Sequence, residues 1–321
     1  MPGDSGGEQQ VGGLGEFGLI RRVTAGRTPA PGTLLGPGDD AAVVAAPDGR
    51  VVVSTDVLVE GVHFRLDWST PHQVGRKAVA ASFADVAAMG AVATALVVGL
   101  GCPARTPVGT VDGLVAGMWE EVGRTGADVV GGDVVTTEQV VLSLTALGDL
   151  QGRLPVTRAG ARPGDVLALC GRLGWSAAGL AVLGRGFRSP VAVVGAHRVP
   201  EPSYDAGPQA ARAGATAMID TSDGLLADAG HVAEASGVGI DVFSAALPVP
   251  QRLIDVGSAL GVDPLRWVLT GGEDHALAAT FPCDVVLPQG WAAIGMVRKG
   301  NGVVVDGRSY DGPGGWDHFR T

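Results

Sequence analysis

Apolar residues follow two spacings along this 321-residue chain, and their alternation predicts a protein built from both strands and helices. Short β-branched runs bounded by turn residues predict strands at 40–46 and 50–55. A helix is expected next, because Thr70 and Gln73 fit a capping box and Pro71 suits the first helical position. The elements expected after it are a strand at 93–100, a helix at 106–124 and strands at 127–132 and 139–150.

A segment rich in Gly, Pro and Arg at 150–165 predicts a domain boundary, and strands and helices alternate again beyond it. We therefore expect a flexible tail at 1–13, an N-terminal domain at 14–150 and a C-terminal α/β domain at 151–321. The elements expected in the second domain are a strand at 165–171, a helix at 175–183, a long polar segment containing PEPSYDAGP, a strand at 216–220 that leads into a helix opening at TSDG, and strands near 239–243, 274–280 and 291–305.

Composition narrows the class of protein. Hydrophobic residues make up 46% of the chain, which is enough for sizeable cores, but no apolar run approaches the roughly 18 residues of a membrane span. The N-terminus lacks a basic-then-apolar signal, so we expect a cytoplasmic protein without a membrane partner. A net charge of −10 and the lack of a Lys/Arg cluster argue against nucleic acid as a partner. The three cysteines form no CxxC pair and predict neither disulfides nor a zinc site.

Aspartates stand where apolar runs end, or inside an apolar helix. Asp56, Asp133 and Asp220 each close a predicted strand, and Asp223 follows three residues after Asp220. Asp85 lies within the helical segment KAVAASFADVAAMG. A buried carboxylate costs several kcal/mol unless it is paired or binds a metal. Because lysines are few and arginines rarely neighbour these acids, a metal is the more economical partner.

Each acid taken alone also has a simpler interpretation. Asp39 and Asp40, behind a Gly-Pro-Gly turn, fit a solvated turn, and Asp223 or Ser222 fits a helix cap. Their joint occurrence favours Mg²⁺, which binds hard oxygen ligands and bridges phosphates. The residues therefore suggest a polyphosphate enzyme that holds its nucleotide through metal ions. Hydroxyl ligands of the same type are added by Ser54 and Thr55.

Other sequence motifs give little evidence of function. GLGEFG at 13–18 fits G-x-G-x-x-G, but no strand precedes it, and neither a Walker A loop nor HExxH occurs. His63 and His275 are the histidines nearest the acidic motifs. A lone histidine is more often a packing or surface residue than a functional one, so both interpretations stay open.

Ten motifs in order, from about residue 14 to 319, resemble the thiamine-monophosphate kinase family. GDDAA and the acidic strand ends also occur in aminoimidazole ribonucleotide synthetase and selenophosphate synthetase, whereas STDVLVEGVHF with GGED and WDHF is more specific. The motifs are GEFGLI (15–20), GPGDDAAVV (36–44), STDVLVEGVHF (54–64), KAVAASFADVAAMGA (77–91), GGD (131–133), TRAGARPGD (157–165), SAAGLAVL (176–183), MIDTSDGL (218–225), LTGGEDHAL (269–277) and WDHF (316–319).

The resemblance implies an α/β (α+β) chain with the two-domain aminoimidazole ribonucleotide synthetase-like fold. In that fold the N-terminal mixed sheets of a homodimer pair into a barrel, and ATP is held at the dimer. The implied reaction is ATP plus thiamine monophosphate giving ADP and thiamine diphosphate, by direct in-line transfer assisted by several Mg²⁺ ions and without a general base. Thiamine monophosphate and ATP are then the small-molecule partners.

The matching positions imply roles for individual residues. Mg²⁺ ligands are expected at Asp40, Ser54, Thr55, Asp56, Asp85, Asp133, Asp220 and Asp223; ATP contacts at Gly132, Asp133, Arg158 and Ser222; and thiamine monophosphate contacts at His63, Glu273 and Trp316. Asp39 is expected to support the turn instead of binding metal directly.

Three positions depart from the family pattern. Ala84 stands where a serine usually precedes the helix aspartate, Val134 where a threonine often follows GGD, and His275 where an aromatic residue commonly follows GGED. Two other readings stay open: another member of the superfamily, such as aminoimidazole ribonucleotide synthetase, or a non-catalytic nucleotide or metal sensor. Selenophosphate synthetase fits less well, since the first cysteine is Cys102.

Overall fold

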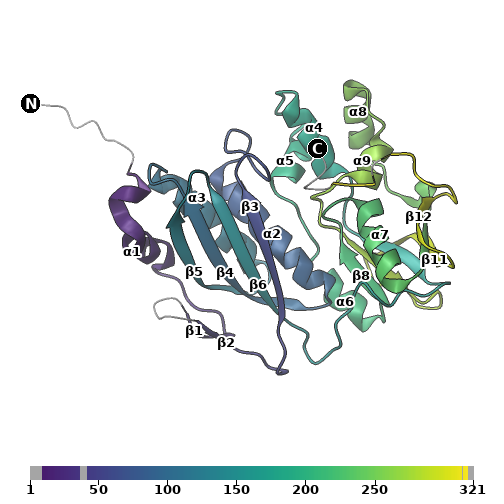
Figure 1. The fold of residues 1–321 in the computed structure, drawn as a ribbon, viewed down its shortest axis with the longest axis horizontal. Helices are drawn as coiled ribbons and strands as arrows, with labels where there is room; N and C mark the ends of the chain where they lie inside the picture. The colour runs from purple at the N-terminus through teal and green to yellow at the C-terminus, as the bar shows by residue number, and fades with distance from the viewer. Residues whose placement is uncertain (1–8, 37–41, 313, 317–321) are drawn as a thin grey trace, which may run out of the picture. The chain divides into compact units, whose positions relative to one another are not determined.

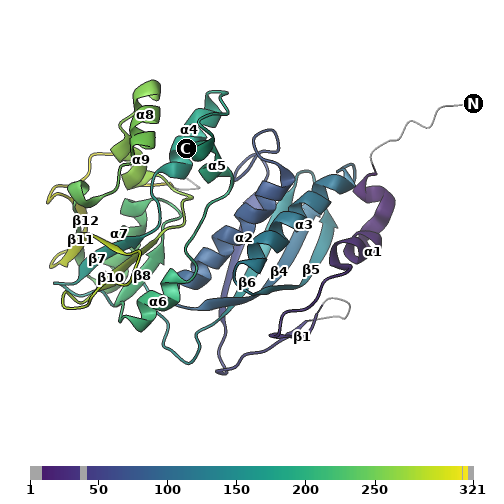
Figure 2. The same cartoon turned by 180° about the vertical axis from the view of Figure 1, so that it is seen from behind.

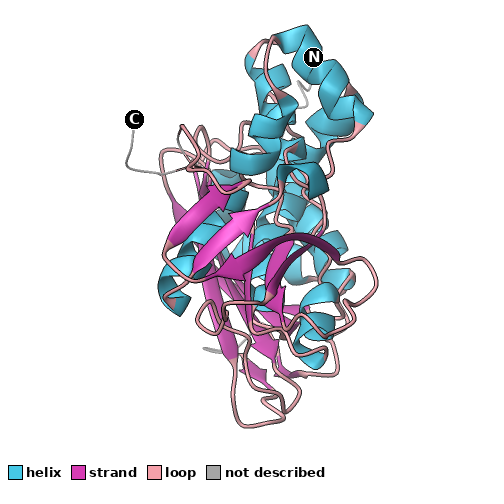
Figure 3. Ribbon diagram, turned by 90° about the vertical axis from the view of Figure 1, so that its right-hand side faces the viewer, coloured by secondary structure: helices cyan, strands magenta, loops and turns pink. Residues whose placement is uncertain are grey.

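The structure is a computed structural model that describes residues 9–36, 42–312 and 314–316. The chain divides into two compact units. Unit 1 comprises residues 1–47, 53–82 and 93–147, and unit 2 comprises 48–52, 83–92 and 148–321. Figure 3 shows the strands of both units in magenta and their helices in cyan.

The first group of elements contains a four-stranded sheet of order β3-β6-β4-β5 and a small β1-β2 sheet. Helices α2 and α3 lie on one face of the larger sheet, behind the strands in Figure 1 and in front of them in Figure 2. The elements are α1 (Val11–Thr24), β1 (Thr33–Leu35), β2 (Val43–Val44), β3 (Val52–Val59), α2 (Pro71–Ala88), β4 (Val92–Cys102), α3 (Val108–Gly123), β5 (Asp128–Thr136) and β6 (Val141–Asp149).

Local sequence explains how α2 begins and how it packs on α3. The predicted capping box is confirmed: the Thr70 N–H donates to Gln73 Oε1 (3.0 Å), and the Gln73 N–H donates to Thr70 Oγ1 (3.2 Å). The two helices approach closely at Gly75 and Gly117, where a Cβ atom would lie 2.0 Å from the Leu114 carbonyl oxygen and 1.9 Å from that of His72. Glycines thus allow the close packing of α2 against α3, the two helices that cover the sheet.

The second group contains a six-stranded sheet of order β12-β9-β11-β7-β10-β8. Helix α6 lies on one face of this sheet and α7 on the other (Figures 1 and 2). The elements are β7 (Val166–Cys170), α4 (Trp175–Gly184), α5 (Val191–Arg198), α6 (Ala206–Arg212), β8 (Ala217–Asp220), α7 (Leu225–Ser236), β9 (Gly239–Val242), the 3₁₀ turn η1 (Ser244–Ala246), α8 (Gln251–Leu260), α9 (Pro264–Thr270), β10 (Leu277–Phe281), β11 (Ala292–Arg298) and β12 (Gly302–Val305).

One core of unit 2 explains why the end of α2 belongs to this unit. Ala87 and Ala88 pack in the same buried cluster as Ala206 and Ala210 of α6 and Phe281 of β10. A single cut in the sequence therefore does not separate the two units. The predicted boundaries at 14–150 and 151–321 stay predictions.

Several elements differ from the sequence prediction. Helix α1 begins at Val11, inside the stretch expected to be a tail. The long polar segment that contains PEPSYDAGP includes α5 and α6, for which no helix was predicted, and α8 and α9 were not predicted either. These helices have 14 residues or fewer, so each has few turns over which a helical periodicity can be recognised. None of the helices in the described ranges combines the length and hydropathy needed to cross a bilayer.

Candidate active site

The loop from Asp220 to Gly224, called the acidic loop below, joins β8 to α7 and binds two distant segments through its main chain. The N–H of Glu273 donates to the carbonyl oxygen of Ser222 (2.7 Å), and that of Trp316 donates to the carbonyl oxygen of Asp223 (3.0 Å). Residues expected to contact substrate are thereby bonded to residues expected to contact metal and ATP. This arrangement lies within unit 2.

Two glycines make this approach possible. A Cβ at Gly272 would lie 2.3 Å from the Ser222 carbonyl oxygen, and a Cβ at Gly315 would lie 2.5 Å from that of Asp223. Real Cβ atoms do not approach an oxygen so closely, so a side chain at either position would push its segment away from the acidic loop. The GG of GGED and the glycine before Trp316 are therefore needed for packing.

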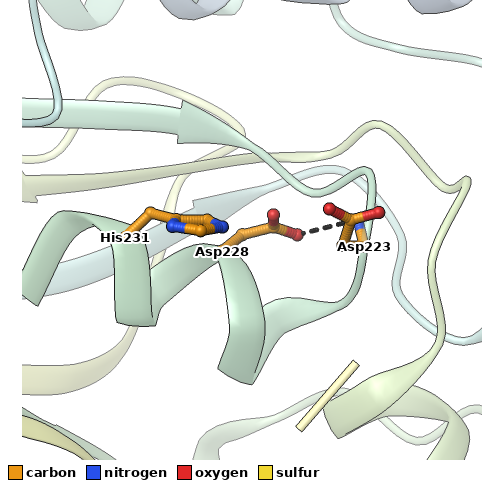
Figure 4. A group of neighbouring side chains, drawn as sticks. All are labelled: Asp223, Asp228 and His231. Atoms are coloured by element: carbon orange, nitrogen blue, oxygen red, sulfur yellow. Dashed lines mark hydrogen bonds between the residues drawn. The ribbon is translucent and has the colours of Figure 1, made fainter. Parts of the chain in front are cut away.

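Asp228, in the first turn of α7, points its carboxylate toward Asp223 of the acidic loop (Figure 4). Its Oδ2 accepts hydrogen bonds from the N–H groups of Asp223 (3.1 Å) and Gly224 (2.9 Å). Burial and the charges of Asp220 and Asp223 raise the pKa of the Asp228 carboxyl to about 8, although the two N–H bonds act the other way. Ligand atoms of Asp223, Asp228 and His231 all lie within 4.8 Å of one another. Because Asp228 already binds main-chain donors, we assign it a structural role.

The carboxylate of Asp220 lies against a buried histidine. His275 Nδ1 is 3.0 Å from Asp220 Oδ2, and the two side chains are only 9% and 5% exposed. Burial alone lowers the pKa of the His275 imidazole, but the hydrogen bond and the charge of Asp220 outweigh it, so that the pKa lies above its usual value. The charges of Glu273 and Asp85 act in the same direction. Asp85, from α2, therefore belongs to the same electrostatic cluster.

The residues around GGED adopt uncommon backbone conformations. Glu273 (φ 64°) and His275 (φ 51°) are left-handed non-glycine residues, a feature often found at functional sites. Asp274 between them accepts hydrogen bonds from the N–H groups of Gly174 (2.5 Å) and Ser176 (2.8 Å), at the start of α4. Burial raises the pKa of the Asp274 carboxyl to about 7 against the effect of these bonds. Asp274 thus anchors the strained turn that presents Glu273.

A second buried histidine lies beside Glu273. His197 Nδ1 is 3.3 Å from Glu273 Oε2 and 3.1 Å from Ser176 Oγ. The Glu273 side chain is 33% exposed, whereas that of His197 is 8% exposed. The carboxylate is thus held on its protein side and open on the other, as a ligand contact requires.

In unit 1, strand β3 divides the STD motif between two faces of the sheet, because successive side chains alternate. The Thr55 hydroxyl donates to the Leu144 carbonyl oxygen (3.1 Å) and lies 3.1 Å from Thr145 Oγ1. Ser54 and Asp56 share the other face. Asp56 Oδ2 is buried and has no hydrogen-bond partner among the described residues. An unmatched buried carboxylate oxygen fits a site for a cation.

The GGD motif lies on β5, at the opposite edge of the sheet from β3. A Cβ at Gly132 would lie 2.1 Å from the Val98 carbonyl oxygen, and Asp133 is exposed, with Oδ1 accepting from the Val134 N–H (2.8 Å). Three strand spacings separate β3 from β5, or about 14 Å. The sheet of one chain therefore does not bring Asp56 and Asp133 together.

The remaining predicted residues are placed as follows. His63 Nδ1 accepts from the Val59 N–H (3.1 Å), at the end of β3. Arg158 has an exposed side chain, and its carbonyl oxygen accepts from Ser236 Oγ (2.9 Å). Trp316 is 61% exposed. Asp39 and Asp40 lie outside the described residues.

The donor set suits Mg²⁺. The predicted ligands in the described ranges are carboxylates and hydroxyls, which are hard oxygen donors, and they include no cysteine or histidine. Sequence reasoning missed three supporting residues: Asp228, Asp274 and His197. The partners of Asp274 and His197 lie in distant segments, and those of Asp228 are main-chain N–H groups of the acidic loop, so the spacing of residue types could not identify them.

Comparison with known proteins places this architecture in a class. Residues 38–150 match the family model of the AIR synthase related protein N-terminal domain, and residues 162–272 match that of the C-terminal domain. The fold is thus that of the AIR synthase related proteins. E. coli HypE, a hydrogenase maturation protein, shares it with a TM-score of 0.71 at 22% identity, over 92% of this chain and 96% of that one. At this identity the likeness extends to the fold alone.

Closer relatives define the family. Thiamine-monophosphate kinase from Mycobacterium tuberculosis is 56% identical over 308 residues, which cover 95% of this chain and 92% of the relative. A solved structure of AaThiL complexed with AMPPCP and TMP matches with a TM-score of 0.81 at 33% identity and covers 97% of this chain and 99% of that one. The chain belongs to the thiamine-monophosphate kinase family and is an enzyme of the kinase class.

Proposed function

We propose that this enzyme transfers the γ-phosphoryl group of ATP to thiamine monophosphate, giving ADP and thiamine diphosphate. Family membership supports the reaction, and the complex of AaThiL with AMPPCP and TMP supports the two substrates. Of the alternatives, the non-catalytic sensor is disfavoured, because the chain keeps each aspartate of the expected ligand set. A cytoplasmic location and the lack of a nucleic-acid partner stay predictions.

The acidic loop is the observation that carries the proposal. Its residues Asp220, Ser222 and Asp223 are the expected metal and ATP contacts, and its carbonyl oxygens accept from Glu273 and Trp316, the expected substrate contacts. The residues expected to bind the phosphate donor and those expected to bind the acceptor are thus positioned by the same short loop. In-line phosphoryl transfer depends on such positioning.

The acceptor explains why a general base is not needed. A phosphate monoester has a second pKa of about 6 and is largely ionised at neutral pH, so its oxygen is already a nucleophile. The obstacle is repulsion between two anionic reactants. We therefore assign binding and charge neutralisation, not proton removal, to the side chains of the site.

Mg²⁺ would supply the neutralising charge when bound and would hold the phosphates of both substrates. The buried Asp56 Oδ2, which has no hydrogen-bond partner within the described part of the chain, supports this assignment. In our proposal the chain's part is to fix the ligand oxygens before the substrates arrive. The residues proposed to hold Mg²⁺ are Asp40, Ser54, Thr55, Asp56, Asp85, Asp133, Asp220 and Asp223.

The thiamine moiety would be recognised by its charge and ring system. Trp316 offers an exposed π face to the cationic thiazolium, and Glu273 offers an opposite charge or an acceptor for the aminopyrimidine. His63 completes the substrate set. For ATP, Arg158 would add charge-assisted hydrogen bonds beside contacts from Gly132, Asp133 and Ser222.

Purified protein with ATP, Mg²⁺ and thiamine monophosphate should form thiamine diphosphate and ADP in equal amounts, as measured by chromatography.

Asp56→Asn should lower kcat at least about 100-fold, because a lost metal contact removes several kcal/mol of charge stabilisation. Asp112→Asn is the matched control, since Asp112 is an exposed acid paired with Arg22. Equal turnover by Asp56→Asn and Asp112→Asn would refute the metal assignment. ATP consumption with an aminoimidazole precursor, but not with thiamine monophosphate, would favour the aminoimidazole ribonucleotide synthetase alternative.

Gly315→Ala should raise the KM for thiamine monophosphate about 10-fold with little change in the KM for ATP, because it displaces the Trp316 segment and weakens a cation–π contact. Gly314→Ala is the control, since the nearest atoms to a Cβ there lie at 3.9 and 4.0 Å. Steady-state kinetics of both variants measure the KM for thiamine monophosphate and the KM for ATP. Matching KM values would show that Trp316 does not contact the substrate.

We also propose that the enzyme is a homodimer formed through the face of the larger unit 1 sheet opposite α2 and α3. Among the described elements of unit 1, α2 and α3 cover one face of this sheet (Figures 1 and 2). On β3, Val53 is 61% exposed and Val57 is 50% exposed, although both are apolar. Exposed apolar residues on a sheet face support burial against a second copy.

Val53→Asp should convert a dimer into a monomer, because it would bury an unpaired charge in the interface. Analytical ultracentrifugation should give twice the 32.2 kDa chain mass for the unmodified protein and the chain mass for the variant. Val286→Asp, at a valine that is 90% exposed and outside this sheet, should stay dimeric. A dimeric Val53→Asp protein would place the interface elsewhere.

A further inference from the structure

His275 is joined to the acidic loop by both its side chain and its main chain. Its Nδ1 is 3.0 Å from Asp220 Oδ2, and its N–H donates to the carbonyl oxygen of Thr221 (3.0 Å). A carboxylate accepts hydrogen bonds only, so Nδ1 carries the proton in this contact. The register of β10 against β8, where Leu277 pairs with Asp220, fixes the two strand ends from the other side. The ring therefore has little freedom to leave Asp220.

The surroundings of the ring are acidic. Asp220, Glu273 and Asp85 all act on His275 electrostatically, and His275 itself is buried. A histidine that only filled space would need no donor directed at a carboxylate. The hydrogen bond occupies one oxygen of Asp220 and fixes the plane of its carboxyl group.

We propose that His275 is a positioning residue, which holds the Asp220 carboxylate by one oxygen so that the other can be given to Mg²⁺. This inference rests on the proposed function, in which Asp220 is a metal ligand. Hydrogen bonds from neighbouring protein groups to a metal-binding side chain orient that side chain, and their loss typically lowers metal affinity about 10- to 100-fold. The role is distinct from substrate packing, which the position after GGED suggests from sequence alone.

Two substitutions separate the hydrogen bond from the volume of the ring. His275→Phe keeps an aromatic ring but removes the donor, whereas His275→Asn keeps an N–H donor near the position of Nδ1 in a smaller side chain. His72→Phe is the control, because His72 is 41% exposed and pairs with Glu120 on α3. Each variant is compared with the unmodified full-length protein.

The test is Mn²⁺ binding in the presence of AMPPCP, measured as the loss of the free-ion electron paramagnetic resonance signal. His275→Phe should raise the Mn²⁺ dissociation constant about 10- to 100-fold, while His275→Asn should stay within about 3-fold of the unmodified protein. In turnover, His275→Phe should raise the Mg²⁺ concentration needed for half-maximal rate and leave the KM for thiamine monophosphate unchanged. His72→Phe should alter neither quantity.

Unchanged Mn²⁺ binding by His275→Phe would overturn the inference, and so would equal loss in the Phe and Asn variants, which points to ring packing. If His275→Phe does not fold, as judged by circular dichroism, the Asn variant decides alone: retained affinity supports the inference and a loss beyond tenfold overturns it. The proposed function fails separately. If the unmodified protein binds Mn²⁺ and His275→Phe weakens that binding, but the unmodified protein forms no thiamine diphosphate, the reaction is refuted and the positioning role stays intact.

Discussion

Hydrogen bonding to the main chain of the acidic loop is the constraint on which the rest of the site depends. Glu273 and Trp316 both donate to this loop, Asp228 accepts from it, and His275 binds it twice. Main-chain groups leave little freedom in distance, so the segments are held in register. A reaction that must align two phosphates benefits from such a frame, because misplacement of the reacting atoms by about 1 Å can cost 100-fold in rate.

The concentration of acids explains the unusual supports around them. Carboxylates brought together repel one another, and burial adds a desolvation cost. Main-chain N–H groups donate to Asp228 and Asp274, and the buried imidazole of His275 lies against Asp220. Burial nevertheless raises the pKa of Asp228 to about 8 and that of Asp274 to about 7. These groups restrain the acids of unit 2. In unit 1, by itself, the buried Asp56 Oδ2 is unmatched among the described residues. A divalent cation is the partner that this arrangement favours.

Sequence reasoning reached the parts of the molecule whose causes are local. The start of α2 follows from Thr70 and Gln73, and the end of β8 at Asp220 follows from the apolar run before it. Sequence did not identify Asp274 or His197, since their partners come from other segments, nor Asp228, whose partners are main-chain N–H groups just before α7. His275 departs from the family pattern, but its bond to Asp220 depends on the pairing of β8 with β10, which the spacing of residues in the sequence does not give. Short helices such as α5 were missed because eight residues carry too little periodicity.

We propose that the nucleotide is held mainly through metal ions bound by aspartates. The most direct test of this proposal is the affinity for AMPPCP, measured by isothermal titration calorimetry in excess Mg²⁺ and in excess EDTA. Tight binding in Mg²⁺ and a loss of at least about 100-fold in EDTA is the predicted result, because several kcal/mol of charge neutralisation is removed. Equal affinity in the two conditions would contradict the account and assign nucleotide binding to the protein's own cations.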